Sequence, residues 1–182
     1  MALSATACGV PTDSSAQGIS AQAVPFNLLK AGQDNRAPVV ARQPSTYTHI
    51  FLVGNNQHLV QVTRIVKAPV QAKGLLQDLL AGPTDAESAA GLSSAVPDRT
   101  RLRSAETTLG VITLDLTQAF GQVSGREEVL AVAQIVYTAT ALPGVTGVIF
   151  DLSGKPVEVP DGKGTLVQGP VTRSDYRAVA PG

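Results

Sequence analysis

The sequence has few aromatic residues and no tryptophan; Phe, Tyr and Trp together make up 4% of its 182 residues. A hydrophobic core must therefore be built from Val, Leu, Ile and Ala. Only one cysteine is present, Cys8, so no disulfide can form within the chain. No apolar run reaches the ~18–20 residues that a bilayer-spanning helix needs. Lys and Arg number 14, as do Asp and Glu, so the positive surplus typical of nucleic-acid binding is absent.

The composition nevertheless supports a folded domain, because 43% of the residues are hydrophobic and only 15% are charged. Residues 1–8 form a short segment that ends at Cys8. Residues 9–44 are rich in Ser, Ala, Gln, Gly and Pro without periodicity, which predicts a flexible linker. The apolar stretch "AVPFNLL" at 23–29 interrupts that linker and is a candidate docking segment.

The first half of the expected domain predicts a hairpin followed by a helix. The β-branched runs 48–53 and 58–66 are joined by "GNNQ", whose Gly and Asn tolerate positive φ. Leucines at i, i+3 and i+4 spacing in "APVQAKGLLQDLLAGP" then predict an amphipathic helix, which Gly82 and Pro83 end. The run 84–98 is expected to be a loop with at most one helical turn.

The second half repeats this order. Residues 99–117 predict two strands around a turn near 108–110, and residues 124–144 predict a helix with a Ser124–Glu127 capping box. The apolar stripe of this helix is expected to be Val129, Val132, Ala133 and Val136. Residues 145–152 and 155–159 then form a hairpin across Ser153–Gly154. The order ββ-α-ββ-α-ββ predicts an α/β (α+β) fold, a two-layer sandwich with two helices on one face of a mixed or antiparallel sheet. We expect this domain to cover 45–162, with a C-terminal tail at 163–182.

The titratable residues form no recognisable catalytic or metal-binding set. His49 and His58 flank the first hairpin, but no Cys, Asp or Glu is placed to complete a metal site with them, so we expect hydrogen-bonded strand histidines. Asp115 ends a strand without an identifiable partner. We therefore expect no catalytic residue, no metal and no cofactor.

Three arginines, Arg99, Arg101 and Arg103, alternate along a predicted strand. Residues two apart on a strand point to the same side, so these would form a basic stripe with Leu102 facing the core. Such a stripe either discourages edge-to-edge aggregation or contacts an acidic partner, an anionic lipid or a wall polymer.

Several segments together carry a family resemblance. "LLQDLLAGPTDAESAAGLSSAVPDRT", "GVITLDLTQAF" and "AQIVYTATALPGVTGVIFDLSGKPVEVP" resemble the GerMN (sporulation and spore germination) domain. The resemblance covers about residues 48–160. It implies a non-catalytic interaction module with an α/β fold similar to ring-building motifs. It also implies a cell-envelope protein, such as the spore germination lipoproteins and the actinobacterial lipoproteins of the LpqB type.

Because such proteins usually carry a lipobox, the resemblance implies that residues 1–8 are the remnant of a lipoprotein signal and that Cys8 is the lipidated residue. Ala5, Thr6 and Ala7 are the small residues that a lipoprotein signal peptidase requires before its cysteine. "MALSATA" has no charged start and is shorter than the ~7–15 apolar residues of a signal. Either the precursor begins further upstream or Met1 is an added initiator. Acylated Cys8 would anchor the chain outside the cytoplasmic membrane, with 9–44 as a tether.

The sequence thus favours a non-enzymatic, membrane-anchored envelope lipoprotein whose domain binds another envelope protein or a wall polymer. One alternative is a small extracytoplasmic hydrolase of wall material, which predicts a pocket where Asp115 meets Glu127 or His49. The other is a ligand-carrying lipoprotein, which predicts an apolar cavity beneath the helices.

Overall fold

A computed structural model describes residues 44–182 of the chain. Residues 1–43 lie outside the described residues. They include the predicted lipidation site Cys8, the predicted linker 9–44 except for its last residue, and the candidate docking segment 23–29. Among the residues described, no helix is both long enough and apolar enough to cross a membrane.

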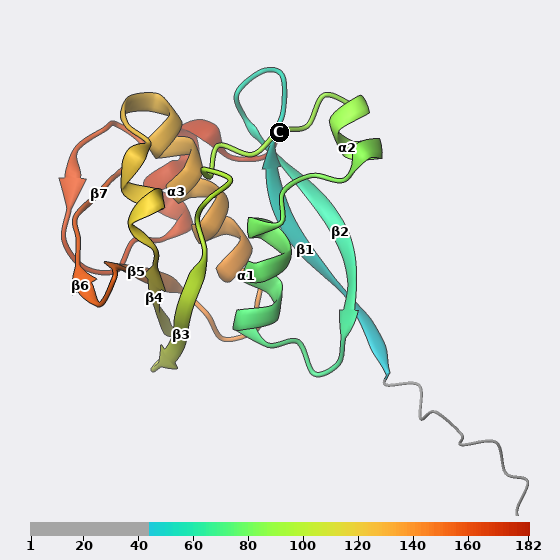
Figure 1. Cartoon of the computed structure of the whole chain (residues 1–182), viewed down its shortest axis with the longest axis horizontal. Helices are drawn as coiled ribbons and strands as arrows, with labels where there is room; N and C mark the ends of the chain where they lie inside the picture. The colour runs from blue at the N-terminus through green and yellow to red at the C-terminus, as the bar shows by residue number, and fades with distance from the viewer. Residues whose placement is uncertain (1–43) are drawn as a thin grey trace, which may run out of the picture. The chain divides into compact units, whose positions relative to one another are not determined.

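The first element pair is the predicted hairpin. Strands β1 (Ser45–Val53) and β2 (Leu59–Lys67) pair antiparallel over nine residues without a register shift. They form a two-stranded sheet of their own (Figure 1). The last four residues of β1 are buried, whereas β2 alternates between half-buried and exposed residues after Leu59. Strand β2 is thus the outer strand, with one face directed inwards.

The second sheet contains the later strands in the order β3-β4-β5-β6. Strands β3 (Leu102–Thr108) and β4 (Val111–Leu116) form an antiparallel hairpin, and β4 pairs parallel with β5 (Gly147–Leu152). The parallel pair needs a crossover connection, which a helix supplies. Strand β6 (Lys155–Pro156) returns from β5 through Ser153 and Gly154, both at positive φ, as predicted for a tight hairpin turn.

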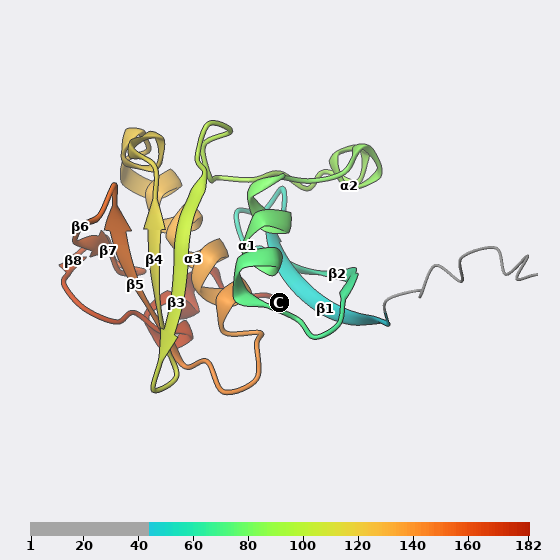
Figure 2. The same cartoon turned by 60° about the horizontal axis from the view of Figure 1, so that its bottom comes forward.

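Two helices lie between these two sheets. Helix α1 (Ala72–Leu80) and the crossover helix α3 (Gly125–Ala139) pack against each other, and both contact β1 (Figure 2). Helix α1 also contacts β3, and α3 also contacts β5. The α+β class and the mixed and antiparallel sheets are therefore confirmed. The strands, however, do not form the single expected sheet with both helices on one face.

The physical reason for this difference is the burial of α3. The sequence predicted one apolar stripe along this helix, but every residue from Val129 to Ala139 is buried. A helix covered on one side only would expose roughly half of these positions. With sheets on both sides, Leu130, Ala131 and Ile135 are as buried as the predicted stripe.

The C-terminal residues complete the core. Short strands β7 (Val159–Pro160) and β8 (Leu166–Val167) pair with each other, and the 3-10 helix η3 (Arg173–Val179) packs on α3. Val171, Tyr176 and Val179 are at most 1% exposed. The described residues, 44–182, all belong to one compact unit. The expected boundary at 162 is therefore too early, and 163–182 is part of the domain rather than a tail.

The expected loop at 84–98 contains a short helix, α2 (Asp85–Ala89). Thr84 caps it by accepting from the Glu87 amide, and the Glu87 carboxylate accepts from the Thr84 amide. These two bonds form a capping box that was not predicted. The capping box predicted at Ser124 and Glu127 does not form, because Ser124 makes no side-chain capping bond. A 3-10 helix, η2 (Gln118–Gln122), precedes α3 and buries Phe120.

Candidate functional site

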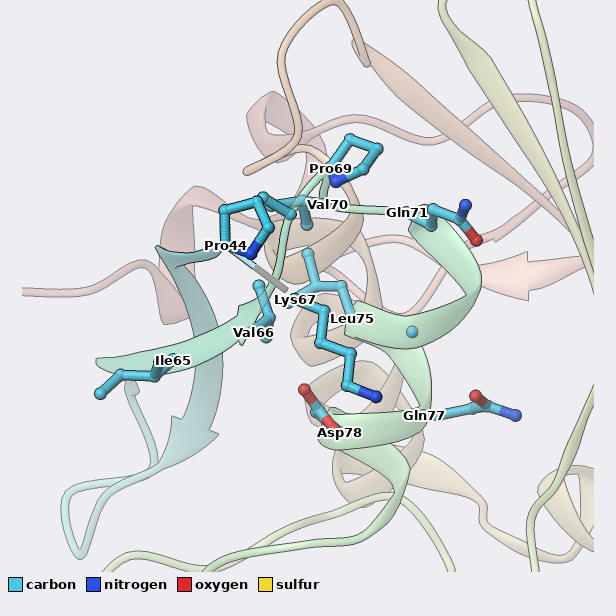
Figure 3. A pocket seen from close by; sticks show the side chains of 12 residues that line it. Pro44, Ile65, Val66, Lys67, Pro69, Val70, Gln71, Leu75, Gln77 and Asp78 are labelled. Atoms are coloured by element: carbon cyan, nitrogen blue, oxygen red, sulfur yellow. The ribbon is translucent and has the colours of Figure 1, made fainter. Parts of the chain in front are cut away.

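A groove of about 760 Å³ lies between the end of β2 and helix α1 (Figure 3). Leu75, which is 1% exposed, and the half-buried Val66 and Val70 give it an apolar interior. Lys67 and Asp78 place opposite charges along it. The groove is lined by Pro44, Ile65, Val66, Lys67, Ala68, Pro69, Val70, Gln71, Gly74, Leu75, Gln77 and Asp78.

Gly74 keeps this groove open on the helix side. It lies inside α1, and a Cβ built on it would meet no atom within 4 Å. A helical glycine costs about 0.5–1 kcal/mol relative to alanine. The sequence predicted the helix, and its isolated glycine is a signal of a packing or functional reason that was not used in that prediction.

An ion pair fixes α2 near the same face of the molecule. The Arg64 guanidinium on β2 donates two hydrogen bonds to the Glu87 carboxylate, one of them 2.7 Å long. Both side chains are less than one-fifth exposed. The bonds from Arg64, with the Thr84 amide and hydroxyl adding to them, lower the pKa of Glu87 to about 2. This ionised pair therefore persists through the physiological pH range.

A second groove, of about 770 Å³, lies beside the end of α1 and includes Arg101. The Arg101 guanidinium donates to the carbonyls of Asp98 and Thr100, so it braces the turn that precedes β3. Arg99 lies within that turn and is exposed. Because β3 begins at Leu102, the expectation that Arg99 and Arg101 lie on a strand is wrong.

Arg103 does lie on β3, but it belongs to an intramolecular ion pair. Its Nε donates to Asp115 Oδ2 on β4 over 2.8 Å. Asp115 Oδ1 accepts from the Gly154 amide, and this bond, assisted by Arg103, lowers the pKa of the Asp115 carboxyl. Asp115 therefore ties the β5–β6 turn to the sheet. The three arginines thus do not form one stripe on a strand face.

The residues of the hydrolase alternative have separate partners. Asp115 contacts Arg103 and Gly154, whereas Gln61 Nε2 lies 3.3 Å from His49 Nδ1. Glu127 is exposed on the first turn of α3. His58 Nδ1 instead lies 3.3 Å from the Ala180 carbonyl oxygen. Within residues 44–182, no three His, Cys, Asp or Glu side chains are grouped so that they could hold a metal.

The chain is similar in fold to three solved structures. The tandem GerMN domains of the sporulation protein GerM from Bacillus subtilis share 19% identity and a TM-score of 0.59 with it, covering 72% of this chain and 48% of that one. This chain thus spans about half the length of the tandem structure. The first GerMN domain of the same protein shares 19% identity, covering 71% of this chain and 99% of that chain, with a TM-score of 0.56.

The third structure is a protein of Clostridium perfringens assigned as a lipoprotein. It shares 18% identity, covers 74% of this chain and 92% of that one, and has a TM-score of 0.51. A search of curated proteins finds no match. The family model "Germane: Sporulation and spore germination" matches residues 45–158, which confirms the resemblance seen in the sequence. The chain therefore belongs to the sporulation and spore germination family, whose domain is called GerMN.

Proposed function

We propose that this chain is a non-enzymatic cell-envelope lipoprotein whose GerMN domain binds a segment of another envelope protein in the groove between β2 and α1. The observation that carries the proposal is the apolar groove floored by Leu75 and left open at Gly74. An apolar centre with a polar rim is typical of protein–protein interfaces. The relatives named above include a sporulation protein and a protein assigned as a lipoprotein, which supports an envelope role.

The chemistry of the groove favours a protein segment over a wall polymer. Its described lining contains no aromatic ring on which a sugar could stack, and its floor is aliphatic. An aliphatic side chain of the partner would contact Leu75 and Val66, while Lys67 and Asp78 would pair with polar groups that flank it. Burying one such side chain contributes about 1.5–3 kcal/mol.

The groove is tested by enlarging residue 74. We expect Gly74→Phe to weaken capture of the cross-linked partner from the native envelope by about tenfold or more, because the ring would occupy the groove. The fold should persist, since a Cβ at this position meets no atom within 4 Å. The measurement is quantitative mass spectrometry of proteins cross-linked to the full-length lipoprotein, with wild type and variant compared side by side.

Gly74→Ala is the matched control. It removes a helical glycine and should raise the free energy of unfolding by about 0.5–1 kcal/mol while leaving the groove largely open. Capture of the partner should therefore be unchanged. Equal capture by the Phe variant and the wild type, with both folded, would show that the partner binds elsewhere.

We also propose that Cys8 carries the lipid anchor, as in the LpqB-type lipoproteins of actinobacteria, and holds the domain outside the cytoplasmic membrane. Ala5, Thr6 and Ala7 before Cys8 support the assignment. Two or three acyl chains anchor a protein firmly, whereas one alone binds marginally.

Radiolabelled fatty acid should accordingly label the wild-type protein produced from its own precursor in its native host. The Cys8→Ser variant should lose the label and be found in the soluble fraction. A serine variant of an unrelated small residue, such as Ala16→Ser, is the control and should be labelled like the wild type. Equal labelling of the Cys8 variant would end the assignment.

A further inference from the structure

The two edges of the β1–β2 hairpin differ in how their backbone groups are satisfied. On the β1 edge, the Phe51 amide donates to Thr138 Oγ1 over 3.1 Å, and the Phe51 carbonyl accepts from Gln134 Nε2 over 3.0 Å. Val53 exchanges two backbone hydrogen bonds with Ser93. Helix α3 and the chain after α2 therefore cover the last part of this edge, at Phe51 and Val53.

The hydrogen-bond phase of the hairpin shows which residues face the other edge. Ala68 donates to the Pro44 carbonyl at one end, and Gly54 donates to the His58 carbonyl at the other. Since antiparallel partners alternate, the even-numbered residues of β2 bond to β1, and the odd-numbered ones direct their N–H and C=O groups outwards. The bonds of Phe51 and Val53 on the opposite edge follow the same alternation.

Along the open edge of β2, the outward groups have no partner within residues 44–182. No hydrogen bond found there involves the amides or carbonyls of Gln61, Thr63 or Ile65 on this side. The strand lacks two of the usual protections of an edge, since the register from Leu59 to Lys67 contains no bulge and no proline. Its charged residues are Arg64, which is paired with Glu87, and Lys67 at the end of the strand. Such an edge is a template for pairing with a further strand.

We propose that two copies of this chain pair antiparallel through their β2 strands about a twofold axis at Thr63. A C2 dimer requires a surface that is complementary to itself. With the axis at Thr63, Leu59 faces Lys67 and Gln61 faces Ile65 of the second copy. All nine residues of β2 then pair, and every outward group meets an outward group. Two hairpins become one four-stranded antiparallel sheet.

The side chains fit this register. Arg64 would face Val62 of the second copy, and Lys67 would face Leu59, so no two like charges stand opposite each other. Each Arg64 is already neutralised by Glu87 of its own chain. An axis at Arg64 would instead place the two arginines opposite each other in a non-hydrogen-bonded pair, where facing side chains lie closest and like charges destabilise the pairing.

The same register gives the exposed side chain of Ile65 a neighbour on the second copy. Tyr47 is 74% exposed and Ile65 is 68% exposed, and the two are cross-strand partners. In the dimer, Ile65 would lie between Tyr47 of its own chain and Gln61 of the second copy. Cross-strand neighbours on both sides shield such a residue from water.

The first test removes one outward amide. Full-length Thr63→Pro should shift the monomer–dimer equilibrium, measured by sedimentation equilibrium, by about tenfold or more towards monomer, because proline has no N–H to donate. The hairpin itself should form, since residue 63 does not bond to β1 and the preceding strand residue tolerates a following proline. Thr63→Val keeps the amide and should dimerise like the wild type.

The second test reads the register in a Cys8→Ser background. At the axis the two Thr63 Cα atoms would lie about 5.5 Å apart, within the range that a disulfide spans. Thr63→Cys should therefore cross-link two chains under mild oxidation. Gln61→Cys should not, since its counterpart lies about 13 Å along the strand.

Loss of dimer in Thr63→Pro together with cross-linking of Thr63→Cys alone would support the proposal. Three results would overturn it: a wild type that is monomeric at all concentrations tested, a dimer unaffected by Thr63→Pro, or Gln61→Cys cross-linking as readily as Thr63→Cys. The Gly74 variants lie off this edge and should dimerise normally. Failure of the groove and failure of the dimer are therefore distinguishable.

Discussion

Replacing Tyr176 with alanine is expected to lower the free energy of unfolding by about 4 kcal/mol. The side chain is 0% exposed, and its hydroxyl donates to the Pro160 carbonyl over 2.8 Å. The variant loses the packing of a whole ring and leaves a cavity beside α3. Urea denaturation of the full-length protein, followed by far-UV circular dichroism, measures the change.

Tyr176→Phe is the matched control, because it keeps the ring and removes only the hydroxyl. It should cost about 1–2 kcal/mol, the value of one buried hydrogen bond whose acceptor is left unpaired. If Tyr176→Ala lowered the free energy of unfolding by less than Tyr176→Phe does, η3 would not unfold together with the rest of the domain. That result would restore the boundary at 162.

Replacing Gln134 with leucine should cost about 3 kcal/mol, the second-largest effect expected. This side chain is 0% exposed, and it joins two segments that are distant in sequence. Its Oε1 accepts from the Ala95 amide over 2.7 Å, and its Nε2 donates to the Phe51 carbonyl. Leucine has a similar volume but leaves the buried Phe51 carbonyl and the part-buried Ala95 amide without their partner. Thermal and urea unfolding measure the loss.

Gln122→Leu serves as the control for this prediction. Gln122 is exposed at the end of η2, so its replacement should change the free energy of unfolding by no more than about 0.5 kcal/mol. A Gln134→Leu protein as stable as the Gln122 variant would mean that other groups satisfy Phe51 and Ala95. The edge of β1 would then depend on Thr138 and Ser93 rather than on Gln134.

The strands and the two longer helices could be predicted because their apolar periodicity is local. Residues such as Ile112, Leu114 and Leu116 alternate with more exposed neighbours, and the structure buries all three in β4. How the strands divide into sheets could not be predicted in this way. It depends on Gln134 and Thr138, which look like solvent-facing residues of α3 but bond to β1.

The capping boxes show why a correct local rule can select the wrong site. Thr84–Glu87 and Ser124–Glu127 have the same spacing. The first forms, and Arg64, which lies 23 residues before Glu87 in the sequence, holds the carboxylate in place. A tertiary contact of this kind cannot be recognised from a four-residue sequence pattern.

The candidate site residues could likewise be predicted only as far as local sequence patterns determine them. The three arginines formed a regular local pattern, but the strand that would align them starts only at Leu102. Gly74 is an isolated glycine within the helical pattern of α1, and that local signal was available in the sequence. The second wall of the groove, from Ile65 to Lys67, became apparent only once β2 and α1 were placed beside each other.

The hydrogen bonds between the first hairpin and distant parts of the chain also have a consequence for the order in which the chain can fold. The residues of β1 are synthesised early, yet the hydroxyl that accepts the hydrogen bond of the Phe51 amide belongs to Thr138, 87 residues later. His58 contacts Ala180, which is 122 residues further along. Contacts at such separations delay folding. During synthesis from the N-terminus, this core therefore cannot be completed until nearly the last residue has been added. Until then, the backbone groups on the β1 edge of the first hairpin lack the partners they have in the folded domain, so both edges of the hairpin are open.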